Sequence, residues 1–237
     1  MSNELLIVIN IIGLYSAVLL WFTLFGIKGL YCFSIFATIV ANIEVLILVV
    51  AFGLEQTLGN VLFATTFVVT DIVSELCGHK EAQKVVNINI ATSVLFVLVT
   101  QCWLLYTAAE SDFAMDSIVT LFSNTPRLVF ASLIVYAVAQ SLDVFLYKKW
   151  WAFTEKKFAN KRKFLWVRNN CSTLISQLVN AVLYTLTAFY GVYDFDIVLS
   201  IMLTSYIIFV VTSFADTPVV YLARKINDRK LAKTVTD

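Results

Sequence analysis

Residues 5–25 read LLIVINIIGLYSAVLLWFTLF and hold no charged side chain. A helix needs about 20 apolar residues to cross the roughly 30 Å hydrocarbon layer of a bilayer. The leader before this run, Met1 to Glu4, carries an acid and no basic residue, and the run is longer than the apolar core of a secretory signal. The stretch therefore predicts a retained membrane-spanning helix.

The whole chain has the composition of a membrane protein. Of its 237 residues, 60% are hydrophobic and 14% are charged, whereas soluble domains average about 45–50% and about 25%. Seven Gly and two Pro supply little turn chemistry, which disfavours disorder and turn-rich β folds. The sequence has no basic, aromatic-interleaved stretch typical of nucleic-acid binding. We therefore predict an all-α, polytopic helix bundle in a lipid bilayer.

Seven apolar runs are long enough to be spans. They cover residues 5–25, 30–52, 60–77, 85–109, 128–148, 170–190 and 197–222. Short loops rich in Lys and Arg stay in the cytoplasm. With seven spans, sixteen basic residues fall on one side: Lys28, Lys80, Lys84, Lys148, Lys149, Lys156, Lys157, Lys161, Arg162, Lys163, Arg168, Arg224, Lys225, Arg229, Lys230 and Lys233. Only Arg127 falls on the other side, so the pattern predicts an outside N-terminus and an inside C-terminus.

Metal and catalytic signals are weak. The four cysteines form no C-x-x-C pair, and the single histidine, His79, has no ligand cluster beside it. We expect buried thiols, no metal site and no cofactor. No Walker motif is present for ATP. No span contains the histidine of a Ser/His pair, so we expect a protein that is not an enzyme.

Acids inside the apolar runs carry the functional information. Five lie in or at the edge of the predicted spans: Glu44, Asp71, Glu75, Asp143 and Asp216. A central acid costs about 2.5–3.5 kcal/mol on insertion scales. Apart from Lys148, the last residue of its run, no Lys or Arg lies within a predicted span to neutralise these acids. They must be protonated, hydrated or paired with a ligand that donates hydrogen bonds, so we interpret them as functional.

Helical spacing gathers these acids with other polar side chains. Asp71, Asp143 and Asp216 each lie roughly 9 Å from the cytoplasmic end of their predicted helix. Amides lie deeper, at Asn42, Gln140, Gln177 and Asn180. The shared faces are Asp71 with Glu75; Tyr136, Gln140, Asp143 and Tyr147; Thr173, Gln177, Asn180 and Tyr184; and Ser205, Phe209, Thr212 and Asp216. A cavity edged with carboxylates, amides and Tyr rings suits a flat, polar heteroaromatic ligand. Glu44 lies about 200° from Asn42 around its helix, so we expect it outside this face.

Four ordered motifs also carry a resemblance. They are TDIVSELCGHKEA at 70–82, AQSLDV at 139–144, RNNCSTLISQ at 168–177 and ANI at 41–43. They resemble motifs of the queuosine precursor transporter family, also called the vitamin uptake transporter family, and Asp216-Thr217-Pro218 fits as well. The family commonly has Asp three residues after the last Gln of these motifs, where this chain has Asn180.

The resemblance implies a single transporter domain over residues 1–237 in a bacterial cell membrane. Residues 1–28 would form an extra N-terminal helix, 30–222 a six-helix family core and 223–237 a basic cytoplasmic tail. The activity implied is import of 7-deazaguanine bases, such as preQ0, preQ1 or queuine, for tRNA modification. The substrate-binding candidates are Asn42, Asp71, Glu75, Gln140, Asp143, Ser172, Gln177, Asn180 and Asp216.

Within this set, Asp71 and Asp143 are expected to be the main ligand acceptors. Gln140 and Gln177 would read the other polar edge of the base, and Glu75 would shape its helix.

Two alternatives come from other classes of protein. A substrate-binding subunit could dock on a separate ATPase module through the small residues Ala37 and Ala41, four apart on one helix. An intramembrane aspartyl enzyme could use Asp71 and Asp143, although no G-x-G-D segment occurs. The sequence leaves open which precursor is preferred, whether transport is coupled to protons and whether the protein forms a homodimer.

The charge asymmetry makes a testable prediction of topology. We expect the N-terminus outside the cell and the C-terminus inside, because lysines and arginines retain loops in the cytoplasm. Side-specific reporters fused at Ser2 and at Asp237 should give opposite signals. Signals from the same side of the membrane would rule out an odd number of spans.

Overall fold

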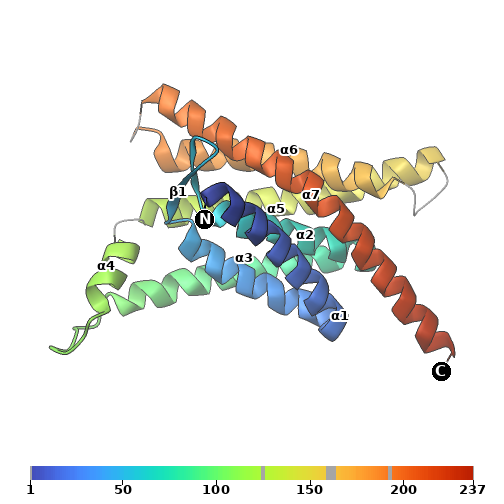
Figure 1. The fold of residues 1–237 in the computed structure, drawn as a ribbon, viewed down its shortest axis with the longest axis horizontal. Coiled ribbons are helices and arrows are strands. Elements are labelled where there is room, and N and C mark those ends of the chain that lie inside the picture. The colour runs from blue at the N-terminus through green and yellow to red at the C-terminus, as the bar shows by residue number, and fades with distance from the viewer. Residues whose placement is uncertain (1, 124–125, 159–163, 192–193, 237) are drawn as a thin grey trace.

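The structure is a computed structural model that describes residues 2–123, 126–158, 164–191 and 194–236. Within these residues the chain forms seven α-helices and one two-stranded β-hairpin. The elements are α1 (Asn3–Glu44), β1 (Leu48–Ala51), β2 (Leu54–Thr57), α2 (Gly59–Cys77), α3 (His79–Trp103), α4 (Met115–Ser123), α5 (Pro126–Phe158), α6 (Leu165–Phe189) and α7 (Phe195–Thr236). The long helices run alongside one another as a bundle (Figure 1), so the predicted all-α class is confirmed.

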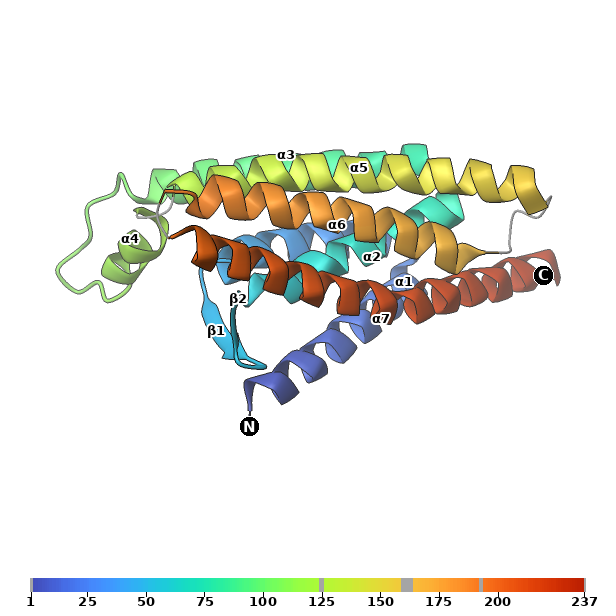
Figure 2. The same cartoon turned by 90° about the horizontal axis from the view of Figure 1, so that it is seen from above.

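The first helix consists of two segments that meet at Gly26. Gly26 has φ 64° and ψ −148°, which is not helical, and the chain reverses there. The rings of Trp21 and Phe33, one from each segment, pack with centroids 6.2 Å apart. Figure 2 shows the two segments leaving this bend in different directions. They correspond to the predicted spans 5–25 and 30–52.

The predicted end of the second span, at Phe52, is wrong. The helix ends at Glu44, and an antiparallel hairpin of β1 and β2 follows. The hairpin turns at Phe52 and Gly53, which both have positive φ, 55° and 73°. Two consecutive residues with positive φ form a tight hairpin turn, and the twist of this turn matches the twist of the two paired strands. The apolar run 48–52 therefore belongs to a strand and its turn.

The N-terminus is tied to this hairpin. The Nδ2 of Asn3 donates to the carbonyl oxygen of Val50 at 2.8 Å, and the backbone N–H of Phe52 donates to Glu4 at 3.0 Å. The C-terminal end of α7 lies at the opposite end of the bundle (Figure 1). We call these the hairpin end and the far end.

Other helix boundaries also differ from the prediction. The span predicted at 85–109 is found six residues earlier, as α3. α2 ends at Cys77, and the single residue Gly78 (φ 86°) separates it from the start of α3. α5 and α7 continue as helices beyond the predicted ends at residues 148 and 222. The predicted tail from residue 223 is thus helical as far as Thr236, and α4 was not predicted.

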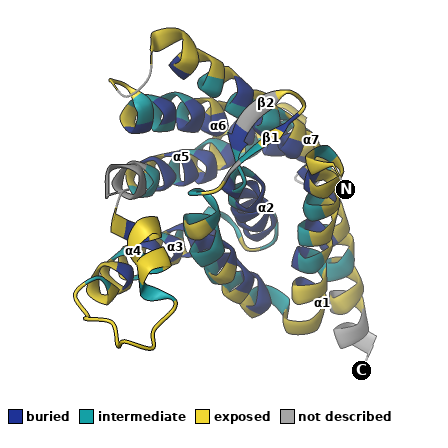
Figure 3. Ribbon diagram, turned by 60° about the vertical axis from the view of Figure 1, so that its left-hand side comes forward, coloured by how far each residue is buried: buried dark blue, intermediate teal, exposed yellow. Residues whose placement is uncertain are grey.

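The helices bury a core around α2 and expose apolar side chains outward. Figure 3 shows α2 as mostly buried, with the other helices around it. Outward residues such as Leu95 and Ile207 stay 62% and 57% exposed, as expected for side chains that face lipid. Of the described helices, α1, α2, α3, α6 and α7 are long and apolar enough to cross a membrane. The chain is a multi-pass membrane protein.

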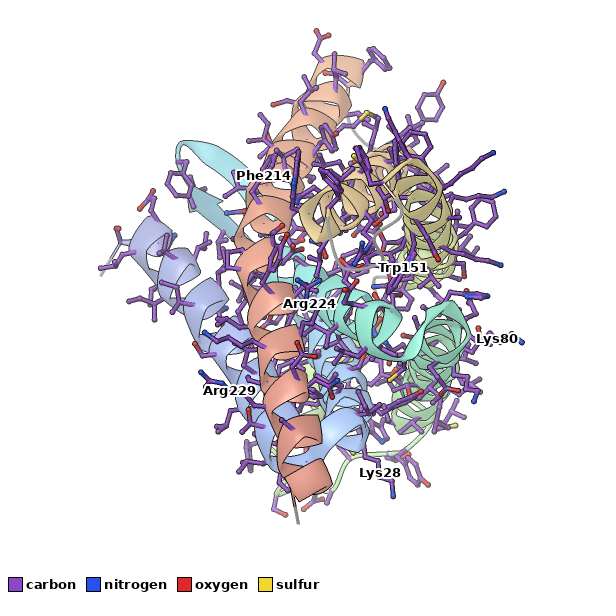
Figure 4. All side chains as sticks on the ribbon, turned by 90° about the vertical axis from the view of Figure 1, so that its right-hand side faces the viewer. Lys28, Lys80, Trp151, Phe214, Arg224 and Arg229 are labelled. Carbon is purple, nitrogen blue, oxygen red and sulfur yellow. The ribbon has the colours of Figure 1, made fainter. Side chains whose placement is uncertain are left out.

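Basic residues gather at the far end. Figure 4 looks at the bundle from this end and shows Lys28, Lys80, Arg224 and Arg229. The loop residues Lys161, Arg162 and Lys163 lie outside the described part of the chain. The charge segregation read from the sequence thus follows one end of the bundle, whereas the side of the membrane stays a prediction.

Gly26→Ala should lower the melting temperature of the detergent-solubilised protein. Its backbone conformation is one that other residues adopt at a cost of about 1–3 kcal/mol, although no heavy atom lies within 4 Å of the added carbon. Gly13→Ala is the matched control, because Gly13 is helical and its added carbon also meets open space. Equal losses in both variants would contradict strain at the bend.

Candidate functional site

A cavity opens in the hairpin half of the bundle, between α1, α2, α3, α5, α6 and α7. It holds about 700 Å³ of space between atoms, with the open solvent at its mouth included. Its lining residues are Thr38, Ala41, Asn42, Val45, Thr57, Gly59, Asn60, Phe63, Thr66, Ser93, Ser132, Leu133, Tyr136, Asn180, Ala181, Tyr184, Ser205 and Phe209.

Aromatic rings from four helices line this cavity. Phe63 of α2 packs edge-on against Tyr136 of α5, with centroids 5.4 Å apart and an interplanar angle of 72°. Phe63 also lies 6.2 Å from the ring of Phe209 on α7. Tyr184 of α6 adds a fourth ring to the lining. Such rings offer apolar faces on which a flat heterocycle stacks.

Two asparagines present amide groups in the lining. The Nδ2 of Asn42 donates to the carbonyl oxygen of Thr38 at 2.8 Å and to Ser93 Oγ at 3.3 Å. Asn60 Oδ1 accepts from the Thr57 hydroxyl at 3.1 Å, whereas Asn60 Nδ2 is buried without a partner. Asn60 therefore carries a free donor in the lining of the cavity.

Asn60 was not among the site residues predicted from the sequence. A signal was available, because Asn60, Phe63 and Thr66 follow one another at helical spacing on one face of α2. The predicted residues of this helix, Asp71 and Glu75, lie in its second half, whereas Asn60 lies in its first turn.

Two predicted amides stand directly behind the cavity wall. Gln140 donates through Nε2 to Thr66 Oγ1 at 2.8 Å, and its Oε1 accepts from Thr70 at 3.3 Å. Gln177 Oε1 accepts from Asn180 Nδ2 at 3.1 Å. Both glutamines are buried, and each contacts a residue that lines the cavity. Of the nine predicted site residues, Asn42 and Asn180 line it themselves.

Three of the predicted acids are held along one face of α6, farther from the hairpin. Each accepts a hydrogen bond from a different α6 side chain: Asp143 from Ser176 (2.9 Å), Asp71 from Thr173 (3.2 Å) and Asp216 from Asn169 (2.7 Å). All three acids are buried within protein. Ser172 lies beside this row and donates to backbone carbonyl oxygens of its own helix. That Asp71 and Asp143 accept from the ligand directly stays a prediction.

Asp71 and Asp143 interact with each other. Their carboxyl groups lie within hydrogen-bonding reach, and both residues have no exposed surface. Asp71 Oδ1 and Asp143 Oδ2 have no donor among the described residues. The two helix faces that the sequence singled out therefore meet at a pair of carboxyl groups.

Glu75 lies apart from the cavity, in an ion-pair network at the far end. It accepts from Arg168 Nε at 3.0 Å and Nη2 at 2.7 Å, from the Tyr147 hydroxyl at 2.8 Å and from Arg224 Nη1 at 3.2 Å. The Arg168 guanidinium has no exposed surface and lies 4.3 Å from the ring centroid of Trp151. Figure 4 shows Trp151 and Arg224 at this end of the bundle. Glu75 thus joins α2 to α5, α6 and α7.

Arg168 and the cysteines correct the sequence analysis. Arg168 was predicted in a cytoplasmic loop, but α6 begins at Leu165 and buries its side chain, because Glu75 and Trp151 surround it. The cysteines were predicted to be buried. Cys32, Cys77 and Cys102 are exposed and Cys171 is partly exposed, as apolar side chains on an outer, lipid-facing surface are.

Glu44 lies outside the cavity, and the two small residues Ala37 and Ala41 face the inside of the bundle. Glu44 is outside the cavity lining, and its Oε2 is buried without a partner. Ala37 is fully buried in the core, and Ala41 lines the cavity. The face that could have approached an ATPase module is therefore turned into the bundle.

Comparison with known proteins identifies relatives of the chain. A family model described as "Putative vitamin uptake transporter" matches residues 57–223. A protein of Bacillus subtilis (strain 168) named "Probable queuosine precursor transporter" is 36% identical over 218 residues, which cover 91% of this chain and 93% of that protein. No solved structure matches the chain.

Arg168→Ala should lower the melting temperature substantially, because it leaves Glu75 buried without its closest partner. Breaking a buried ion pair from one side costs about 3–5 kcal/mol, and the remaining donors Tyr147 and Arg224 should keep the loss near the lower value. Arg168→Lys should not restore it, since a lysine cannot form the forked bond or stack on Trp151. Arg229→Ala, an exposed change on α7, is the control, and an equal shift there would contradict the assignment.

Proposed function

The chain belongs to the vitamin uptake transporter family, and from this premise we propose that it imports 7-deazaguanine bases, the precursors of the tRNA nucleoside queuosine, across the bacterial cell membrane. The name of the Bacillus subtilis relative supports a queuosine precursor as the substrate class. The motifs along the chain that resemble this family support the same assignment.

The cavity with its free amide donor is the observation that carries the proposal. A 7-deazaguanine is flat and presents a ring carbonyl beside a row of N–H donors. In our proposal the ring packs against Phe63, Tyr136 and Phe209, and Asn60 Nδ2 donates to the carbonyl. Asn180, backed by Gln177, offers an amide oxygen or N–H for the other edge. Each neutral hydrogen bond of this kind contributes about 0.5–1.5 kcal/mol.

Import also requires a closed far end while the cavity is open at the hairpin end. We assign this closure to the Glu75 network, because its bonds hold α2, α5, α6 and α7 together at the far end. With the predicted topology, the cavity opens to the outside and the network faces the cytoplasm. Release of the base then requires these helices to separate there while they close at the hairpin end, as in alternating access.

A complementation experiment tests the function. Cells that can neither make queuosine nor take up its precursors would express the full chain and receive 7-cyano-7-deazaguanine, 7-aminomethyl-7-deazaguanine or queuine. We expect queuosine to reappear in tRNA with at least one base and not with an empty vector. Expression of membrane-inserted protein without any restored modification would overturn the proposal.

Asn60→Asp should raise the concentration of base needed for half-maximal uptake by about 2- to 10-fold or more. The aspartate keeps the shape and can still accept from Thr57, but it replaces the free amide donor with an acceptor that faces the ligand's carbonyl. Asn87→Asp, on the exposed face of α3, introduces the same charge away from the cavity and should leave uptake unchanged. Normal uptake by the Asn60 variant would show that the base does not rest against this residue.

A further inference from the structure

A row of polar side chains on α6 connects the cavity to the far end. Asn180 lines the cavity and bonds to Gln177. Beyond them, the acids of three other helices follow in the order Asp143, Asp71 and Asp216, at Ser176, Thr173 and Asn169. From residue 180 to residue 169 the row covers about 16 Å at 1.5 Å per residue, which is about half of the hydrocarbon thickness.

Three hydrogen-bond acceptors of this row are unused. Asp71 Oδ1, Asp143 Oδ2 and Asn169 Oδ1 are all buried, and none has a partner among the described residues. Asn169 is an amide that donates to Asp216 through Nδ2, so its free oxygen is independent of the acids. Ionised carboxylates only accept hydrogen bonds, so the close contact of Asp71 with Asp143 becomes a hydrogen bond only when it holds a proton.

The neighbouring charged groups do not supply the missing donors. Arg168 of α6 and Arg224 of α7 bind Glu75, one helical turn beyond Asp71 on α2, and Tyr147 of α5 donates to Glu75 as well. From α1, the Tyr15 hydroxyl faces the acids and donates to the backbone carbonyl oxygen of Thr212. Every titratable group that we find against the acids is thus committed to another acceptor.

A proton fits this row better than a metal ion does. In the described residues, no three or more side chains of the types His, Cys, Asp and Glu are grouped to hold a metal. The acids instead follow one another along a helix, each beside a hydroxyl or an amide. Chains of intramembrane acids with such neighbours carry protons in pumps and transporters.

We propose that Asp143, Asp71 and Asp216 form a proton relay, and that each base is imported together with at least one proton. The inference rests on the proposed import function. Asp143, the acid nearest the cavity, takes up a proton from that side and passes it across the contact to Asp71. Asp71 passes it on to Asp216, which releases it at the far end. Each step breaks one O–H bond and forms another, so no redox partner is required.

The relay also links transport to closure of the cavity. Closing the hairpin end removes water from the path to the acids, and unpaired carboxylates are costly without water. A bound proton reduces this charge, so the loaded protein changes state more readily than the proton-free protein. Base and proton then move in the same direction.

The test uses the purified full-length protein in liposomes that contain a pH-sensitive dye, with radiolabelled 7-cyano-7-deazaguanine outside. With the outside one pH unit more acidic, we expect about tenfold accumulation for one proton per base and acidification of the lumen on addition of base. A protonophore should abolish the accumulation. Uptake that ignores the pH gradient, or that follows a sodium gradient instead, would overturn the relay and leave the proposed function standing.

Asp216→Asn separates the relay from binding of the base. Asp216 was predicted as a substrate-binding residue, but it does not line the cavity, and it bonds to Asn169, beyond Asp71 in the row. We expect this variant to exchange labelled for unlabelled base at equal pH, which also reports that it is folded, but to lose accumulation and lumen acidification. Asp216→Glu should retain both, and Asp196→Asn, an exposed change at the start of α7, should behave as the parent. A variant Asp216→Asn that still accumulates base on a pH gradient would overturn the relay. If the parent protein exchanges no base in any condition, the import function itself is wrong.

Discussion

Carboxyl groups inside a bilayer need protein groups around them, and this requirement organises the bundle. A central acid that faced lipid would cost several kcal/mol. Here the acids of α2, α5 and α7 all point at α6, and each accepts a hydrogen bond from a hydroxyl or an amide of that helix. Because these partners come from one helix at spacings of three and four residues, α6 fixes the relative positions of the three others. The motif RNNCSTLISQ therefore holds α2, α5 and α7 in position, and it also forms part of the candidate transport path.

The Glu75 network applies the same requirement in a different way. Burial of a guanidinium costs free energy unless the group is paired and hydrogen-bonded. The N–H groups of Arg168 bond to Glu75, and the plane of its guanidinium stacks on Trp151. Tyr147 and Arg224 then fill the remaining acceptor capacity of Glu75. Four helices converge on one carboxylate, so the far end separates only if several bonds break together. The hairpin end has no comparable network around the cavity among the described residues, and this difference makes the far end the natural place for a closed gate.

The sequence predicted the parts of this arrangement that depend on local pattern. Uninterrupted apolar runs revealed the spans, and helical spacing placed Gln140 with Asp143 and Gln177 with Asn180. The predictions that were wrong concern features that depend on tertiary contacts or on backbone geometry. Apolarity alone cannot tell a short strand from a helix end, so the run 48–52 was read as helix. Arg168 follows a cluster of loop lysines, and only its contact with Glu75 brings it into the bundle. A cavity edged with carboxylates was predicted, but the lining holds amides, hydroxyls and rings and no carboxylate, because its walls come from six helices whose packing no single segment specifies.

The acids and the cavity are separated by one layer of amides, and that separation matters for mechanism. If the base and the proton occupied the same carboxylates, each would displace the other, and the proton gradient would oppose import. With the base held among Phe63, Tyr136 and Asn60 and the proton held at Asp71 and Asp143, the two bind together. Gln140 is the link between them, because it bonds to Thr66 in the cavity wall and lies one helical turn from Asp143 on α5.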